Sequence, residues 1–381
     1  MSAQKRPREG SEGEVVEREN GDISSAKQMR SETGAAPAMA QQLVKARVNE
    51  AGDEVTPDWQ QYAALKRAGA VHRTSSLKAP IMLLEGHDAA VYSVCFASTR
   101  SHALASGSHD RRALLWSLSG NCESFLELEH PSPVLEVHWS VDSTTLLTCS
   151  PDKTARLWDP EEGALALELR AHRGIVNSCC TGGLQAPHLA LSASDDCSVC
   201  VWDLRSGERV QQLQERYPVI STCFSEGCGT VFAGGIEECV RAWDLRQASQ
   251  SLVLHGHADT ITGMQLSPDG RSLLTNSADC TLGQWNVEPM AVESRHEKAY
   301  IGHAHNFERN ALRCAWSPDG KRVTAGSSDR NVYVWNAETA KMQYKLPGHA
   351  GSVNEATFHP KEPVIASASS DHTIFLGELD S

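Results

Sequence analysis

The chain has 381 residues, a length that fits two or three average domains or one large all-β unit. Hydrophobic residues make up 40% of it and charged residues 22%, a composition that argues against disorder throughout the chain. The formal net charge of −13 argues against binding nucleic acid by bulk positive charge. No apolar run approaches the roughly 18 residues that span a bilayer, and the polar N-terminus lacks a signal-peptide core, so we expect neither a membrane protein nor a secreted one.

The first 76 residues differ in composition from the rest. They carry 11 basic and 11 acidic residues, which assigns the whole net charge to residues 77–381. Ser, Gly, Ala and Glu dominate up to about Gln41, a mixture that predicts disorder. Later in this tail, Thr56 as N-cap and Pro57 at the first helical position predict a short docking helix over residues 57–68. At about three turns, this helix should fold only against the body of the protein or a partner.

A repeat begins near residue 77. Six tryptophans follow one another at intervals of 42, 44, 41, 42 and 50 residues: Trp116, Trp158, Trp202, Trp243, Trp285 and Trp335. An acidic residue stands six positions before each, and a seventh acid, Asp371, predicts a tryptophan where Gly377 is found. Gly-His or similar pairs, such as Gly86-His87, stand further upstream. In period and motif the sequence resembles a seven-bladed WD-repeat β-propeller over about 300 residues, an all-β fold.

Each repeat contains stretches in which apolar residues alternate with polar ones or form short runs, and turns such as Ser-Pro-Asp-Gly separate these stretches. We therefore expect four strands in each repeat. The predicted blades cover residues 86–119, 124–162, 166–206, 208–247, 250–289, 300–339 and 343–381. The last repeat ends after three strands, so residues 80–84 are predicted to close it from the N-terminal side and remove an open sheet edge.

The WD-repeat resemblance implies a buried hydrogen-bonded tetrad of His, Ser or Thr, Asp and Trp in a complete blade. The matching residues are His87, Ser106, Asp110 and Trp116; His172, Ser192, Asp196 and Trp202; and His257, Thr275, Asp279 and Trp285. A Ser–His–Asp catalytic triad is the other interpretation, but burial and repetition around a ring favour a structural role.

Three repeats depart from the tetrad pattern. The fourth has Tyr217 in place of His, Ala233 in place of Ser and Glu237 in place of Asp; the sixth has Ala325, and the seventh lacks its Trp. We expect these blades to rely more on packing, with the fourth the weakest.

Catalytic and cofactor motifs are absent from the sequence: there is no Walker A loop, no G-x-G-x-x-G, no H-E-x-x-H and no G-x-S-x-G. Cys197-x-x-Cys200 is the one CxxC, and no second pair stands at metal-ligand spacing. Because we expect the chain not to be secreted into an oxidising compartment, the twelve cysteines are interpreted as free thiols. We expect no enzyme activity, no metal or cofactor and no small-molecule substrate.

The surface carries the candidate functional residues. Basic residues follow the turn acids in contiguous blades, and with one neighbour they form a candidate rim: Arg111, Lys153, Arg173, Arg330 and His372. This rim is either a solvated charged face or a docking site for an acidic protein segment or an RNA backbone. Residues 288–310 lengthen the connection into the sixth blade and end in His305-Asn306-Phe307, an interaction loop unless it packs on its own blade.

Some stretches of the sequence resemble one particular group of WD-repeat proteins. Residues 75–84, 305–320 and 346–355, with the ending at Gly377-Glu378, resemble the WD-repeat subunits of the spliceosomal U5 small nuclear ribonucleoprotein. That resemblance implies a non-catalytic scaffold in the nucleus, beside the large U5 scaffold protein, the elongation-factor-like GTPase and the RNA helicase, with RNA contact at most secondary.

Two other classes stay open. Trp-Asp-x-Arg boxes in consecutive blades place Arg205 and Arg246 where a substrate receptor of a cullin-4 ubiquitin ligase would contact the adaptor. A signalling scaffold of the G-protein β type is the third class, but it would lack the match in the sixth blade.

Overall fold

The computed structural model describes residues 46–48, 54–55, 75, 77, 81–100, 102–118, 122–290, 294–306 and 310–379. In these residues every regular element is a strand, so no helix there could cross a membrane. The helix predicted over 57–68 lies outside the described residues, as does most of the tail.

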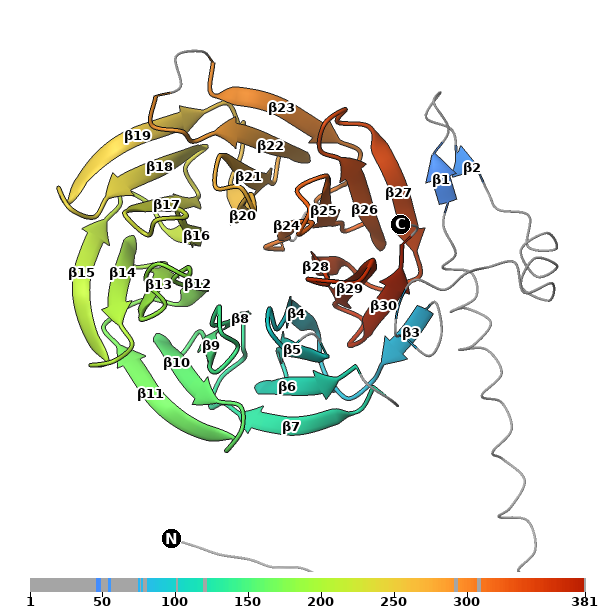
Figure 1. Cartoon of the computed structure of the whole chain (residues 1–381), viewed down its shortest axis with the longest axis horizontal. Coiled ribbons are helices and arrows are strands. Elements are labelled where there is room, and N and C mark those ends of the chain that lie inside the picture. The colour runs from blue at the N-terminus through green and yellow to red at the C-terminus, as the bar shows by residue number, and fades with distance from the viewer. Residues whose placement is uncertain are drawn as a thin grey trace, which may run out of the picture. The chain divides into compact units, whose positions relative to one another are not determined.

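Seven antiparallel sheets surround a central opening, with one strand of each sheet facing the centre and one at the periphery (Figure 1). This confirms the seven-bladed propeller. Sheets 1 to 3, from inner to outer strand, are β4 (Val91–Phe96), β5 (Ala103–Ser108), β6 (Arg112–Ser117) and β7 (Ser124–Glu129); β8 (Glu136–Trp139), β9 (Leu146–Cys149), β10 (Thr154–Asp159) and β11 (Ala164–Arg170); and β12 (Val176–Thr181), β13 (Leu189–Ser194), β14 (Ser198–Asp203) and β15 (Glu208–Gln214).

The remaining four sheets repeat this order. They are β16 (Val219–Phe224), β17 (Thr230–Gly235), β18 (Cys239–Asp244) and β19 (Ser249–His255); β20 (Ile261–Leu266), β21 (Ser272–Ser277), β22 (Thr281–Asn286) and β23 (His296–Ile301); β24 (Cys314–Trp316), β25 (Arg322–Gly326), β26 (Asn331–Asn336) and β27 (Met342–Pro347); and β28 (Val353–Phe358), β29 (Val364–Ser369), β30 (Ile374–Glu378) and β3 (Ile81–Leu84).

The ring closes by pairing the two ends of the propeller. Strand β3 runs antiparallel to β30, with Ile81 opposite Gly377 and Leu84 opposite Ile374. The apolar core between the seventh and first sheets includes Ile374 and Leu376 together with Leu104 and Trp116. Each sheet buries its faces against two neighbours in this way, which is why a single sheet would not be stable alone.

The outer strands correct the predicted blade boundaries. Residues 124–129 were assigned to the second blade, but β7 pairs with β6 and belongs to the first sheet. The same offset holds in sheets 1 to 6, because the fourth strand follows the third in the chain and pairs with it before the chain crosses to the next sheet.

A second correction concerns the tail. Residues within the segment expected to be largely disordered form β1 (Ala46–Val48) and β2 (Glu54–Val55). Strand β1 pairs with β27, so these strands extend the sixth sheet beyond its fourth strand. An outer strand has unpaired backbone groups along one side, and these groups can accept an added strand.

Candidate functional site

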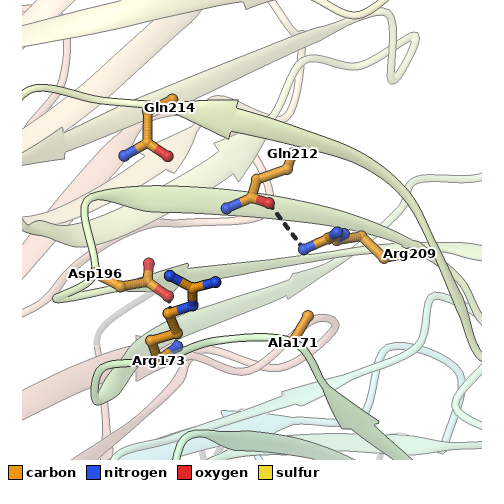
Figure 2. A pocket seen from close by; sticks show the side chains of 6 residues that line it. All are labelled: Ala171, Arg173, Asp196, Arg209, Gln212 and Gln214. Atoms are coloured by element: carbon orange, nitrogen blue, oxygen red, sulfur yellow. Dashed lines mark hydrogen bonds between the residues drawn. The ribbon is translucent and has the colours of Figure 1, made fainter.

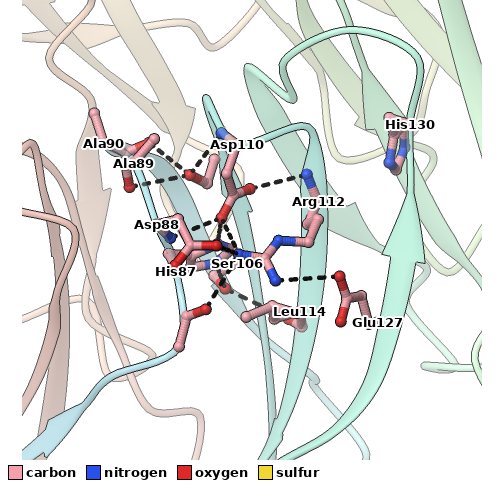
Figure 3. A network of polar contacts seen from close by, with 12 residues as sticks. His87, Asp88, Ala89, Ala90, Ser106, Asp110, Arg112, Leu114, Glu127 and His130 are labelled. Carbon is pink, nitrogen blue, oxygen red and sulfur yellow. Dashed lines mark hydrogen bonds and ion pairs between the residues drawn. The ribbon is translucent and has the colours of Figure 1, made fainter.

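The first sheet shows how the predicted tetrad is built (Figure 3). His87 lies before β4, and its Nδ1 is 2.8 Å from Asp110 Oδ2 while its Nε2 is 2.7 Å from Ser106 Oγ. Trp116 Nε1 donates to the same Ser106 Oγ at 2.8 Å. The chain of bonds therefore runs from the indole through the hydroxyl and the imidazole to the carboxylate.

Burial alone would raise the pKa of Asp110, but hydrogen bonds to the carboxylate outweigh it. The donors are His87 and the backbone amides of Asp88 and Arg112, and they hold the pKa of Asp110 well below its usual range. The acid stays ionised because its charge is fully hydrogen-bonded.

The third and fifth sheets bring their predicted residues together in the same way. In the third, His172 Nε2 is 2.6 Å from Ser192 Oγ and its Nδ1 is 3.1 Å from Asp196, while Trp202 donates to Ser192 at 2.8 Å. The fifth has His257 2.6 Å from Thr275 and 3.1 Å from Asp279, with Trp285 donating to Thr275 at 2.8 Å. The hydroxyls are fully buried and already bonded on both sides, so they offer no nucleophile to a substrate.

The seventh sheet keeps three members of the tetrad. His349 is 3.0 Å from Asp371 and 2.9 Å from Ser367. Phe375 lies edge-on to the imidazole with ring centroids 4.5 Å apart. The aromatic contact that tryptophan makes with histidine in the first, second, fifth and sixth sheets thus comes from a residue two positions earlier, which the missing tryptophan signature did not reveal.

The fourth sheet replaces the tetrad with an ionic network. Trp243 Nε1 donates to Glu215 at 2.5 Å, and Arg241 pairs with Glu215 at 2.8 Å and with Glu237 at 2.5 Å. Tyr217, which stands in the histidine position, is instead exposed. The expectation that this sheet relies more on packing is wrong, because Glu215 supplies the indole acceptor and Arg241 neutralises it.

The second and sixth sheets have neither a complete tetrad nor the ionic network of the fourth. In the second, His130 bonds Thr148 at 2.9 Å, but Asp152 turns to Arg156, and burial together with that cation lowers the pKa of His130 to about 4. In the sixth, Trp335 donates to a backbone carbonyl. Every described tryptophan of the repeat therefore has an acceptor, although the acceptor differs between sheets.

The candidate rim lies on one face of the ring, which we call the acid-turn face. It carries the turns between the second and third strands and the loops that lead into each inner strand. Arg111, Lys153, Arg330 and His372 are exposed there, each in the left-handed region with φ between 69° and 73°. No ion pair joins these four to a carboxylate among the described residues. Arg112 does not add to this charge, because it pairs with Asp88, Asp110 and Glu127.

The sixth-blade loop does not present all of its predicted residues. The backbone amide of His305 donates to Cys280 Sγ, and its ring is 3.4 Å from Asn276, so the side chain is half-buried against the fifth sheet. Burial lowers the pKa of His305 to about 4. Asn306 is half-buried too, and Phe307 lies outside the described residues.

Arg205 and Arg246 lie on the opposite face of the ring. Each follows a tryptophan strand, whereas the acid turns precede it, so the two sets stand at opposite ends of the same strands. Both side chains are exposed, and their backbone amides donate to Asp203 and Asp244 at 2.9 and 2.8 Å. An adaptor that contacts these arginines would leave the acid-turn face free.

The central channel holds a buried charge cluster that sequence reasoning missed. A cavity of about 610 Å³ is lined by the inner strands, and Glu136 pairs there with Arg313 at 2.5 Å. Glu136 also accepts from the amide of Cys179 in the next sheet, as Glu355 does from Val94. Burial raises the pKa of Glu355 to about 7, although Arg313 opposes the shift.

Possible metal ligands occur at one place in this channel. Glu136, Cys149 and Cys179 offer atoms within 4.8 Å of one another. The guanidinium of Arg313 already lies against Glu136 and supplies the positive charge that a metal ion would bring. The predicted CxxC pair is divided between a turn, where Cys197 is half-buried, and the buried interior of β14, where Cys200 lies.

Comparison with known proteins assigns the chain to a family. The model of the WD domain, G-beta repeat, matches residues 78–117, 120–159, 163–203, 248–286, 296–336 and 340–376, and omits the segment that contains the fourth sheet's ionic network.

Relatives match over most of their length. The U5 small nuclear ribonucleoprotein 40 kDa protein of Dictyostelium discoideum is 45% identical over 81% of this chain and 86% of its own, and that of Homo sapiens is 44% identical over 83% and 88%. The pre-mRNA-splicing factor cwf17 of Schizosaccharomyces pombe is 39% identical over 84% of this chain and 94% of its own. This chain, with its seven sheets and repeated tetrads, belongs to the WD-repeat family and, within it, to the group of the U5 small nuclear ribonucleoprotein 40 kDa proteins.

Proposed function

We propose that the chain acts in pre-mRNA splicing as a non-catalytic protein-interaction scaffold of the U5 particle, contributing to spliceosome assembly in the nucleus. The observation that carries this proposal is the identity of 44–45% to the U5 40 kDa proteins over more than 80% of the chain. The buried, fully bonded tetrads support it, because they leave binding at the surface as the function of the fold.

The proposed partners are the large U5 scaffold protein, the elongation-factor-like GTPase and the RNA helicase. The net charge of −13 supports contacts with proteins rather than with an RNA backbone. The contiguous basic residues of sheets 6, 7, 1 and 2 supply a surface for an acidic protein segment: Arg330, His372, Arg111 and Lys153.

Immunoprecipitation of a tagged chain tests the proposal. We expect the wild type to recover U5 snRNA and the large U5 protein, and the double variant Arg111→Glu/Lys153→Glu to lose both. The matched control is Arg205→Glu/Arg246→Glu, which makes the same charge change on the opposite face and should retain them. Unchanged recovery by the acid-turn variant would reject the basic rim as the docking surface.

A cullin-4 substrate receptor is the second candidate function. It is favoured by the exposure of Arg205 and Arg246 in equivalent turns of adjacent sheets. Under this function the wild type would recover the ligase adaptor, and the control pair above would lose it. Recovery of adaptor without any snRNA would reject the splicing role.

A further inference from the structure

A polar pocket opens on the third sheet, and of its lining residues only Arg173 belongs to the candidate rim. Its volume is about 390 Å³, and it is lined by Ala171, Arg173, Asp196, Arg209, Gln212 and Gln214 (Figure 2). Two of these residues are arginines, one from the loop before β12 and one from the outer strand β15.

The third sheet lacks the arginine that two neighbouring sheets carry at one position. Two residues before the tryptophan, the second and fourth sheets place Arg156 and Arg241, each lying across its sheet to reach two carboxylates. The third sheet places Cys200 there, a short, buried side chain that carries no charge across the sheet.

The third sheet also lacks the carboxylate that would neutralise an arginine at this place. In the second sheet Glu168 stands opposite Arg156 on the outer strand and pairs with it at 2.9 Å. Gln212 occupies the matching position opposite Cys200. An uncharged amide therefore replaces the acid.

Both arginines of the pocket lack an ionic partner. Arg209 donates to the amide oxygen of Gln212 at 2.8 Å, and among the described residues neither guanidinium pairs with a carboxylate. Asp196 is the one acid in the lining, and its oxygens already accept from His172, the amide of Arg173 and Ser198. Two cations thus face the pocket with no anion committed to them.

The charge and size of the pocket suit a phosphate monoester better than a carboxylate. A phosphorylated side chain carries −1.5 to −2 charges and three acceptor oxygens, which matches two guanidinium groups, whereas a carboxylate is satisfied by one. The amide nitrogen of Gln212 can donate to the third oxygen, because its amide oxygen is the atom bound to Arg209.

The surroundings favour a single phosphate over a polyanion. Exposed Asp195 and Glu208 flank the lining residues in sequence. These acids would repel the successive phosphates of an RNA backbone but not one phosphate seated between the arginines. We propose that this pocket binds the phosphate of a phosphorylated serine or threonine in a partner protein, a site that stands independently of the splicing role.

Fluorescence anisotropy with degenerate peptide pools tests the site. The probe is a labelled pool with phosphoserine fixed at its centre, compared with matched pools that carry serine or glutamate there. We expect the full-length protein to bind the phosphoserine pool at least about tenfold more tightly than either of the other pools, since charge-assisted hydrogen bonds to two arginines are lost without the phosphate.

Variants separate the pocket from the rest of the surface. Arg173→Gln/Arg209→Gln should weaken phosphoserine binding about tenfold or more. The control Arg205→Gln, an exposed arginine of the same sheet on the opposite face, should bind as the wild type does, with all variants checked for an unchanged melting temperature. Equal binding of the three pools, wild-type binding by the double arginine variant, or stronger binding of a 12-nucleotide RNA that depends on the same arginines would each overturn the proposal.

Discussion

The third and fourth sheets are neighbours in the ring and satisfy the indole of their repeat tryptophan in different ways. In the third, Trp202 reaches Asp196 through a hydroxyl and an imidazole. In the fourth, Trp243 bonds Glu215 directly, and Arg241 neutralises that acid. The requirement that the fold imposes is an acceptor for the indole, and the repeat motif is one of several ways to supply it.

The two solutions differ in what they leave at the surface. Arg241 of the fourth sheet is held by two carboxylates, whereas Arg173 and Arg209 of the third pair with none among the described residues and line an open pocket. In the third sheet the complete tetrad satisfies the indole without an arginine, so Arg173 and Arg209 are available for binding.

The largest effect should come from removing the central cation of the fourth sheet. Arg241→Met leaves Glu215, only 6% exposed, without a counter-charge, and we expect the free energy of unfolding to fall by about 3–5 kcal/mol. The matched change in the third sheet, Arg209→Met, breaks no ion pair and should cost about 0.5 kcal/mol or less. Urea denaturation measures both, and equal losses would contradict the ionic solution for the fourth sheet.

Glu355 in the channel provides a contrast with the neutralised Glu215, because the positive charge of Arg313 only partly offsets the effect of burial on Glu355. The pKa of Glu355 is raised to about 7, so its neutral form stabilises the folded state. That contribution is fully present below pH 4.5 and is lost as the pH rises through 7, a change of about 3 kcal/mol. In Glu355→Gln this part of the pH dependence should vanish from urea melts at pH 4.5 and 8; a variant with the wild-type slope would contradict the assignment.

Removal of one acid from each of the two sheets should lower the free energy of unfolding by different, smaller amounts. Asp196→Ala removes the acceptor of four hydrogen bonds and should cost about 2 kcal/mol. Glu237→Ala should cost about 1 kcal/mol or less, because this acid is 30% exposed and Arg241 keeps Glu215. Equal losses in denaturant melts would reject the structural role of the tetrad.

The smallest expected effect is a change with pH in the stability that is lost when Asp196 is replaced. Burial opposes ionisation of Asp196, but hydrogen bonds from Ser198, Arg173 and His172 prevail and lower its pKa. A lowered pKa stabilises the folded state above the ordinary value, and the gain is lost as the pH falls through the folded-state pKa. The stability gap between wild type and Asp196→Asn should therefore narrow from pH 7 to pH 3, and a constant gap would contradict this sign.

Prediction from the sequence succeeded where one repeat could be compared with the next. The spacing of the tryptophans predicted seven sheets, and the three complete motifs named residues that the structure places within hydrogen-bond distance of one another. It did not succeed for Glu215 or Arg313, because neither belongs to the motif and each has its partner in another part of the chain: Glu215 pairs with Arg241, and Arg313 with Glu136, 177 residues away.

By itself, then, the sequence determined the number of sheets, the position of the complete tetrads and the closing role of residues 81–84. These features depend on backbone hydrogen bonding and alternating burial, which repeat along the chain and can be read locally. Tertiary structure alone decided which buried charges pair, which loop residues turn inward and which arginines remain without a partner beside an open pocket. Those outcomes depend on distances between side chains that only the closed ring brings together.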